Sequence, residues 1–144
     1  MKNSIRFIRI TVMAVILASN AAYAKSNSFL SSAEAKLGSG QNKDAIADFT
    51  RAIEHNQNHS KSDLTQAYNH RGLAKQAIGD VETANSDFRK AIELDPTPKD
   101  AIAFTNRGIA KSAIGDVDGA TSDFKMAFLI SDNSSEESIN LNNG

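Results

Sequence analysis

Apolar and small residues recur with helical spacing between residues 26 and 134, and polar residues separate them. Within residues 42–54, the apolar positions follow the i, i+4, i+7 spacing of an amphipathic helix: Ala45, Ile46, Phe49, Ala52 and Ile53. Glycine-containing breaks follow such segments at Gly38–Gly40, Gly79–Asp80 and Gly115–Asp116. The pattern predicts an all-α fold made of successive antiparallel helix pairs.

The second half of this region contains nearly the same sequence twice. Gly72 recurs 36 residues later as Gly108, and the residues around both glycines match. A more divergent copy precedes them, because Phe49 stands 39 residues before Phe88. A period of this size is typical of stacked helical units. We therefore expect an α-solenoid of three units, over about residues 26–59, 65–98 and 101–134.

The repeated glycines predict specific local geometry. Gly72 and Gly108 lie inside expected helices, where glycine costs on the order of 1 kcal/mol relative to alanine. We therefore expect the partner helix to approach closely at these two positions. Gly79 and Gly115 end the first helix of their units in the left-handed conformation, and the aspartate after each caps the next helix.

The first 24 residues have the pattern of a cleavable secretory leader. The pattern consists of basic residues Lys2, Arg6 and Arg9, an apolar run over residues 10–18, and Ala22-Tyr23-Ala24 before Lys25. An uncleaved membrane anchor is the alternative, but this apolar run is shorter than the roughly 20 residues that a spanning helix needs. We expect an exported protein, periplasmic if the source is Gram-negative and otherwise secreted, without stable membrane insertion after cleavage. Residues 135–144 are expected to form a polar, disordered tail.

Charge and composition exclude several functions. Three of the 16 basic residues and none of the 17 acidic residues precede Lys25, so the remainder carries a net charge of -4. That balance does not favour binding of nucleic acid or anionic lipid. The chain has no cysteine, and no phosphate-binding loop or nucleophile motif is present. We expect no enzymatic activity and no cofactor.

The spacing of aromatic, Gly, Gly-Asp, Ala, Phe and Ala residues over about 34 positions resembles the tetratricopeptide repeat (TPR). The residues that carry the resemblance are Tyr68, Gly72, Gly79, Asp80, Ala84, Phe88, Ala91 and Pro96, then Phe104, Gly108, Gly115, Asp116, Ala120, Phe124 and Ala127. The family implies a right-handed superhelix whose first helices line a concave groove that binds a protein or peptide partner. The groove positions carried over are Asn69, Leu73, Gln76, Ile102, Thr105, Ile109 and Ser112, with Glu34 among those of the first copy.

Some family members grip a C-terminal carboxylate with basic and amide residues at set groove positions. Those positions are here Leu30, Glu34, His70, Ile102 and Asn106. Because this set contains no lysine or arginine, the resemblance does not imply binding of chaperone tails. A groove of amides and aliphatic side chains favours an extended or helical peptide segment.

An arginine and an aspartate recur 16 residues apart in the second and third units. Arg71 stands opposite Asp87, and Arg107 stands opposite Asp123. We expect ion pairs inside each unit, with solvated, unpaired charges as the alternative. The first unit has only Ser32 opposite its aspartate.

The end of the array carries a run of apolar residues that includes Phe128, Leu129 and Ile130. Repeat arrays normally cover their last apolar face with a polar helix. Three outcomes are open: residues 135–141 fold back as a cap, the face docks a partner or a second copy of the chain, or the face stays exposed.

The alternative from a different functional class is a protein that binds a small ligand or a metal ion. His55, His59 and His70 are the only histidines, and the first two have i, i+4 spacing, which can present two ligands to a metal. Two of them lie in a polar connector, which favours solvated or helix-capping roles instead.

Overall fold

The computed structural model describes residue 25, residues 27–55 and residues 60–141, with side chains described through residue 132. These residues contain helices and no strand. A helix over residues 27–38 is followed by α2 (Asn42–Glu54), α3 (Lys61–Ala77), α4 (Val81–Leu94), α5 (Ala101–Ala113) and α6 (Val117–Leu141). The prediction of an all-α solenoid is confirmed.

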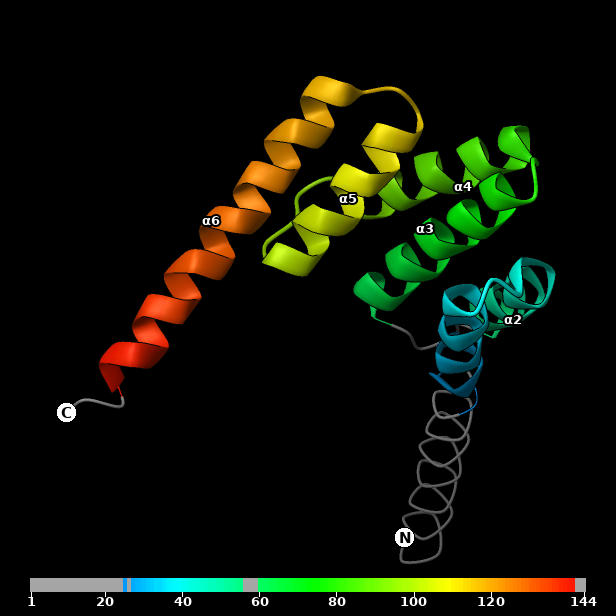
Figure 1. Ribbon diagram of the computed structural model, residues 1–144, viewed down its shortest axis with the longest axis horizontal. Coiled ribbons are helices and arrows are strands. Elements are labelled where there is room, and N and C mark those ends of the chain that lie inside the picture. The colour runs from blue at the N-terminus through cyan, green and yellow to red at the C-terminus, as the bar shows by residue number, and fades with distance from the viewer. Residues whose placement is uncertain (1–24, 26, 56–59, 142–144) are drawn as a thin grey trace, which may run out of the picture.

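Consecutive helices form pairs that stack along the array (Figure 1). The closest packing is within the pairs α3–α4 and α5–α6. Contacts of α2 with α3 and of α4 with α5 join neighbouring pairs, and α3 also touches α5. The first helices of successive pairs therefore lie beside one another.

The turns inside the pairs have the predicted glycine geometry. Gly79 has a φ of 85° and Gly115 a φ of 88°, in the left-handed region. Asp80 accepts a hydrogen bond from the backbone N–H of Thr83, and Asp116 accepts one from Gly119. Each second helix therefore begins at a capped aspartate, as expected.

The core is built from alanines and phenylalanine rings. Phe49 and Phe88 are fully buried, and alanines from neighbouring helices surround both rings. A Cβ atom on Gly72 would lie 2.8 Å from Cε1 of Phe88, and one on Gly108 would lie 2.7 Å from Cε1 of Phe124. The predicted close approach is confirmed, and what approaches is the phenylalanine ring of the second helix.

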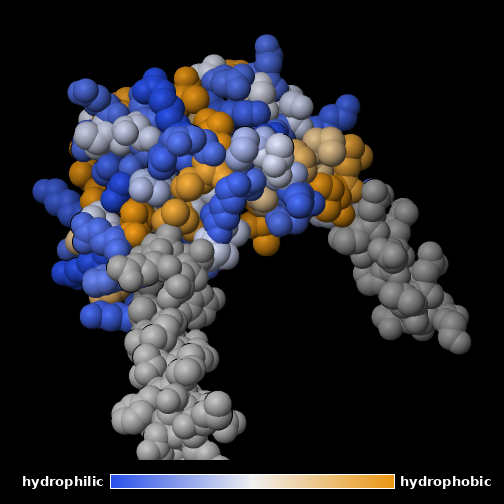
Figure 2. Space-filling model, turned by 180° about the vertical axis from the view of Figure 1, so that it is seen from behind, coloured by the Kyte–Doolittle hydropathy of each residue, from blue (hydrophilic) through white to orange (hydrophobic). Residues whose placement is uncertain are grey.

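The end of the array differs from the prediction. α6 continues as one helix through Leu141, so residues 135–141 neither fold back as a cap nor begin a disordered tail at residue 135. The physical reason is that no glycine or proline occurs from residue 120 to residue 141 to end the helix. Exposed apolar side chains gather on α6 just before the residues drawn in grey (Figure 2).

Candidate functional site

The first helices of the three pairs form a continuous face. Gln66 Nε2 on α3 donates a hydrogen bond of 2.6 Å to Glu34 Oε1 on the preceding first helix. Asn69 Nδ2 donates one of 3.0 Å to the backbone oxygen of Asn106 on α5. We call this the groove face and define it by Glu34, Gln66, His70, Leu73, Gln76, Ile102, Thr105, Ile109 and Ser112.

A polar cluster occupies the part of the groove face where the first and second units meet. His70 Nδ1 lies 3.6 Å from Glu34 Oε1, and the His70 ring meets Phe49 edge-on at a centroid distance of 5.9 Å. Burial lowers the pKa of His70 and outweighs the nearby Glu34 carboxylate, which raises it. His70 is thus neutral at pH 7, and Glu34, whose side chain is 38% exposed, presents its negative charge to the groove.

The groove residues predicted from the sequence are not all accessible. Gln76, Ile102 and Ser112 are exposed, and three others are half-buried: Leu73, Thr105 and Ile109. Asn69 is fully buried and bonds α3 to α5, so its amide joins two units and cannot contact a ligand. This prediction is corrected: the tilt of α5 over α3 covers the position.

The positions equivalent to a carboxylate grip do not converge on one point. Glu34 and His70 are neighbours, whereas Asn106 is buried and Ile102 is 68% exposed. The remaining position, Leu30, packs against the core. These five residues therefore do not form a cluster of basic side chains that could bind the C-terminal carboxylate of a peptide.

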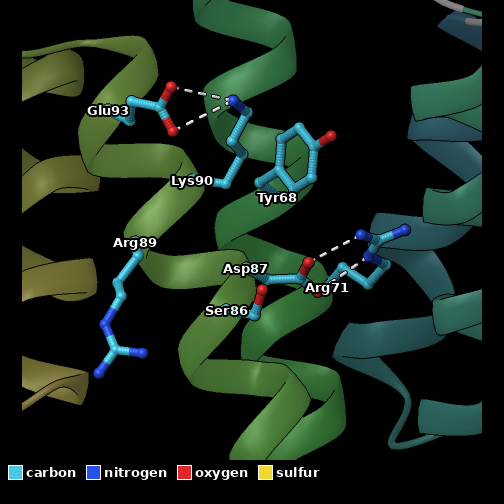
Figure 3. A pocket seen from close by; sticks show the side chains of 7 residues that line it. All are labelled: Tyr68, Arg71, Ser86, Asp87, Arg89, Lys90 and Glu93. Carbon is cyan, nitrogen blue, oxygen red and sulfur yellow. Dashed lines mark hydrogen bonds and ion pairs between the residues drawn. The ribbon is translucent and has the colours of Figure 1, made fainter.

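The predicted arginine–aspartate pairs are present, and their aspartates are buried. Arg71 makes two hydrogen bonds to Asp87, of 2.9 and 2.7 Å (Figure 3). Lys75 Nζ lies 2.8 Å from the same carboxylate, which has only 5% of its side chain exposed. These residues adjoin a hollow of about 440 Å³ that also contains Lys90, whose ammonium group binds Glu93.

The third unit repeats this cluster with Arg107, Lys111 and Asp123. Burial would raise the pKa of Asp123, but hydrogen bonds from Arg107 and Lys111 outweigh it and lower that pKa. Because Lys111 Nζ lies 3.0 Å from Asp123, this lysine belongs to the cluster. The alternative of solvated, unpaired charges is wrong, since the carboxylates are enclosed.

The first unit is less degenerate than the sequence indicated. Ser32, which stands opposite Asp48 in the sequence, donates a hydrogen bond to it, and Lys36 and Arg51 also bind this buried carboxylate. Hydrogen bonds, first from Lys36 and then from Ser32, lower the pKa of Asp48. Each unit thus holds one buried aspartate between cations, which is a structural role.

The terminal apolar residues border a hollow of about 390 Å³ between α5 and α6. Its walls include Ile102 and Thr105, predicted for the groove, together with Phe124 and Phe128 of α6. Phe128 is 66% exposed and Leu129 is 43% exposed, whereas Ile130 is half-buried. The end of the groove face at Ile102 and Thr105 therefore adjoins the predicted docking face on α6.

The histidines are not brought together as a metal site in the described residues. His55 stacks on Phe29 at a centroid distance of 5.7 Å, and His70 lies in the cluster with Glu34. His59 lies outside the described residues. Within those residues no group of three metal-ligating side chains occurs. Among the same residues, no helix has both the length and the apolar character required to cross a membrane.

Comparison with known proteins identifies the repeat. The model of the tetratricopeptide repeat family matches residues 65–98, the second helix pair. Residues 65–98 therefore form a tetratricopeptide repeat, and the chain is similar in fold to solved tetratricopeptide-repeat domains. No protein of curated function matches the sequence.

Several solved TPR domains share the fold. The second TPR of Spaghetti (RPAP3), bound to the HSP90 peptide SRMEEVD, is 25% identical with a TM-score of 0.56, covering 80% of this chain and 93% of that one. The second TPR domain of human RPAP3, in complex with the HSP70 peptide SGPTIEEVD, is 25% identical with a TM-score of 0.50, covering 76% and 85%. The Arabidopsis OM64 TPR domain, 23% identical with a TM-score of 0.52 over 76% and 84%, supports the fold alone.

Sequence reasoning missed two sets of residues in this TPR array. Gln66 was absent from the predicted groove, although it stands 36 residues before Ile102 and so holds the equivalent position. Lys75 and Lys111 were not assigned to the ion clusters, although they recur at the same spacing of 36. The repeat period was the signal that could have identified both sets.

Proposed function

We propose that this chain is an exported, non-catalytic interaction module that binds a peptide segment of a partner protein along its groove face. The observation that carries the proposal is the continuous row of accessible amide, hydroxyl and aliphatic side chains on the first helices. Gln76 and Ser112 are exposed, and the half-buried Ile109 lies on the same helix as Ser112. Backbone amides and side chains of a peptide can pair with such groups. The solved TPR domains bound to peptides support this mode of binding.

The charge of the groove face sets the class of peptide. The peptides bound to the RPAP3 domains end in Glu-Glu-Val-Asp and are acidic. Here Glu34 places a carboxylate on the groove face, and His70 beside it is neutral at pH 7 because its pKa is lowered. Like charges repel across an interface, whereas a cation near Glu34 is favoured. The peptide that fits is neutral or basic, with a lysine or arginine placed to reach Glu34.

Export rests on residues 1–24, which lie outside the described residues. Their basic start, apolar run and Ala-x-Ala ending support cleavage before Lys25. Mass spectrometry of the protein purified from its source tests this step. The expected N-terminus is Lys25, and an intact Met1 in the extracellular or periplasmic fraction would contradict cleavage.

Selection from a random peptide library displayed on phage tests the groove. We expect purified wild-type protein to enrich peptides with a net positive charge. A double variant, Gln76→Arg with Ser112→Arg, should lose at least tenfold of the binding. The matched control is Ser86→Arg with Thr97→Arg, which adds the same charge at exposed positions on α4 and in the connector after it, outside the groove face.

Two results would contradict the proposal. Equal binding by the groove variant and the control would place the ligand elsewhere. Enrichment of acidic peptides, or tight binding of SRMEEVD itself, would refute the assigned charge preference. Replacing Glu34 with Gln separates the two claims, because it should weaken selection for basic residues while leaving peptide binding in place.

A further inference from the structure

The end of the array exposes more apolar surface than the described chain covers. Phe128 is 66% exposed, Leu129 43%, Phe124 41% and Met126 40%. In the second unit the residue equivalent to Phe128 is Ile92, which packs against a core that includes Ala110 of α5. The same position is thus covered inside the array and open at its end. Exposed apolar patches of this kind mark interaction sites.

The rest of the described surface offers little that could cover this patch. Three other large apolar side chains are exposed, Ile78, Val81 and Val117, and they lie at the turns that connect paired helices. Ile102 is 68% exposed but belongs to the patch itself, since it borders the same hollow as Phe128. Within the described residues, the best apolar match for this patch is therefore the same patch on a second molecule.

The charges on α6 indicate how two copies would pair. Lys125, Phe128, Leu129 and Asp132 follow the spacing i, i+3, i+4, i+7, so they form one stripe on the helix, and all four are exposed. Read from Asp132 back to Lys125, the stripe again runs charged, apolar, apolar, charged, but the negative charge now comes first and the positive charge last. An antiparallel partner helix with this stripe therefore places lysine opposite aspartate twice.

We propose that this protein forms a twofold-symmetric dimer through antiparallel packing of α6 against α6 of a second copy. The axis passes between Phe128 and Leu129, so that each Lys125 faces the second copy's Asp132. The hollow beside the stripe, of about 390 Å³, receives the second copy's Phe128 between Ile102 and Phe124. Each surface patch meets its own copy, as an isologous interface requires.

The length of α6 supports this arrangement. α6 spans Val117–Leu141, whereas its partner α5 spans only Ala101–Ala113. Figure 1 shows α6 continuing beyond the end of α5. A helical segment that is not packed against other helices is marginal in water. An antiparallel second copy would lie along this extension, and the dimer contact would share Ile102 with one end of the groove face.

Charge reversal on the secreted or periplasmic protein tests the pairing. Lys125→Glu alone, and Asp132→Lys alone, should each place like charges opposite each other and weaken the dimer at least tenfold in sedimentation equilibrium at low salt. The double variant Lys125→Glu with Asp132→Lys should restore the wild-type dissociation constant. Both positions are exposed, so the reversals should not disturb the fold, and circular dichroism of each variant checks that helix content is unchanged.

Cysteine cross-linking tests the position of the axis. The chain contains no cysteine, so Leu129→Cys introduces a single thiol close to the proposed axis. A short bis-maleimide should join two Leu129→Cys chains efficiently and two Ser86→Cys chains poorly. A wild-type monomer at about 100 µM, single reversals without effect, or a double reversal that fails to restore the dimer would each overturn the proposal.

Discussion

Replacing Arg71 with methionine tests whether the buried aspartates stabilise each unit. Asp87 has 5% of its side chain exposed and receives two hydrogen bonds from Arg71. Leaving a buried charge without its partner costs about 3–5 kcal/mol. Lys75 stays 2.8 Å from Asp87 and retains part of the attraction, so we expect a loss of about 2–3 kcal/mol. Methionine keeps the apolar stem of the side chain, and the change removes the guanidinium together with its hydrogen bond to Thr50.

The matched control is Lys90→Met, on the same hollow (Figure 3). Lys90 binds Glu93, but their side chains are 42% and 70% exposed, and such pairs contribute about 0–1 kcal/mol. Both changes remove one positive charge and introduce the same residue. They differ in the burial of the carboxylate that loses its partner.

Thermal unfolding followed by circular dichroism measures both losses. For Arg71→Met, we expect the melting temperature to fall by about 8–12 °C, using roughly 4 °C per kcal/mol. For Lys90→Met, the fall should stay below about 4 °C. Equal effects of the two substitutions would refute the argument, because burial of Asp87 would then have no energetic consequence.

Three further predictions follow from the same contacts. Gly72→Ala should lower the free energy of unfolding by about 1–2 kcal/mol in urea titrations, because the new methyl group would meet the phenylalanine ring of α4. Gly38→Ala is the control, because open space surrounds Gly38, and it should be neutral or stabilising. The pKa values of Asp48 and Asp123 are lower in the folded protein than in the unfolded chain, where the aspartate pKa is about 3.9. Their contribution to the free energy of unfolding is therefore complete above that pH and is lost as the pH falls through the lower pKa values of the folded protein. The urea midpoint should therefore fall below about pH 4. Because burial also lowers the pKa of His70, the midpoint should already begin to decline as the pH falls below the unfolded histidine value of about 6.5, and a midpoint that rises on acidification would contradict this. Asn69→Asp should destabilise the fold by at least about 2 kcal/mol at pH 7, because a buried carboxylate cannot donate to the backbone oxygen of α5, and a smaller loss than that of Asn69→Ala would refute the role of this bond.

The repeat made much of the fold predictable. Gly72 and Gly108 carry a local cost that only a close contact explains, and the structure places a phenylalanine ring against each. The arginine–aspartate pairs followed from a constant spacing of 16 residues, because that spacing joins the two helices of a pair. Local rules that recur in two copies therefore predicted contacts between helices.

Burial between units could not be predicted in the same way. Asn69 and Gln76 lie on the same face of α3 in the sequence, yet one is fully buried and the other exposed. The difference depends on how α5 crosses α3, and that crossing is set by side chains of both helices together. The burial of Asp48 arises within the first unit instead, since Lys36 on the first helix and Arg51 on α2 belong to one helix pair.

The extent of α6 was predictable in principle. The sequence from residue 120 to residue 141 has neither glycine nor proline, and polarity alone was taken as a sign of disorder. Even residues of low helix propensity, such as the serines and asparagines here, can continue a helix that packing has already started, because adding a residue costs much less than nucleation. The correct boundary would have revealed the length of the exposed α6 stripe.

Site-specific photo-cross-linking in the producing cell tests the central claim most directly. We expect p-benzoylphenylalanine at Gln76, on the groove face, to capture a partner protein through a neutral or basic segment. The same amino acid at Thr97, exposed in the connector between α4 and α5 and outside the groove face, should not capture that partner. Identical products from both positions, or capture from Gln76 of nothing except a second copy of this chain, would contradict the groove face as the binding site.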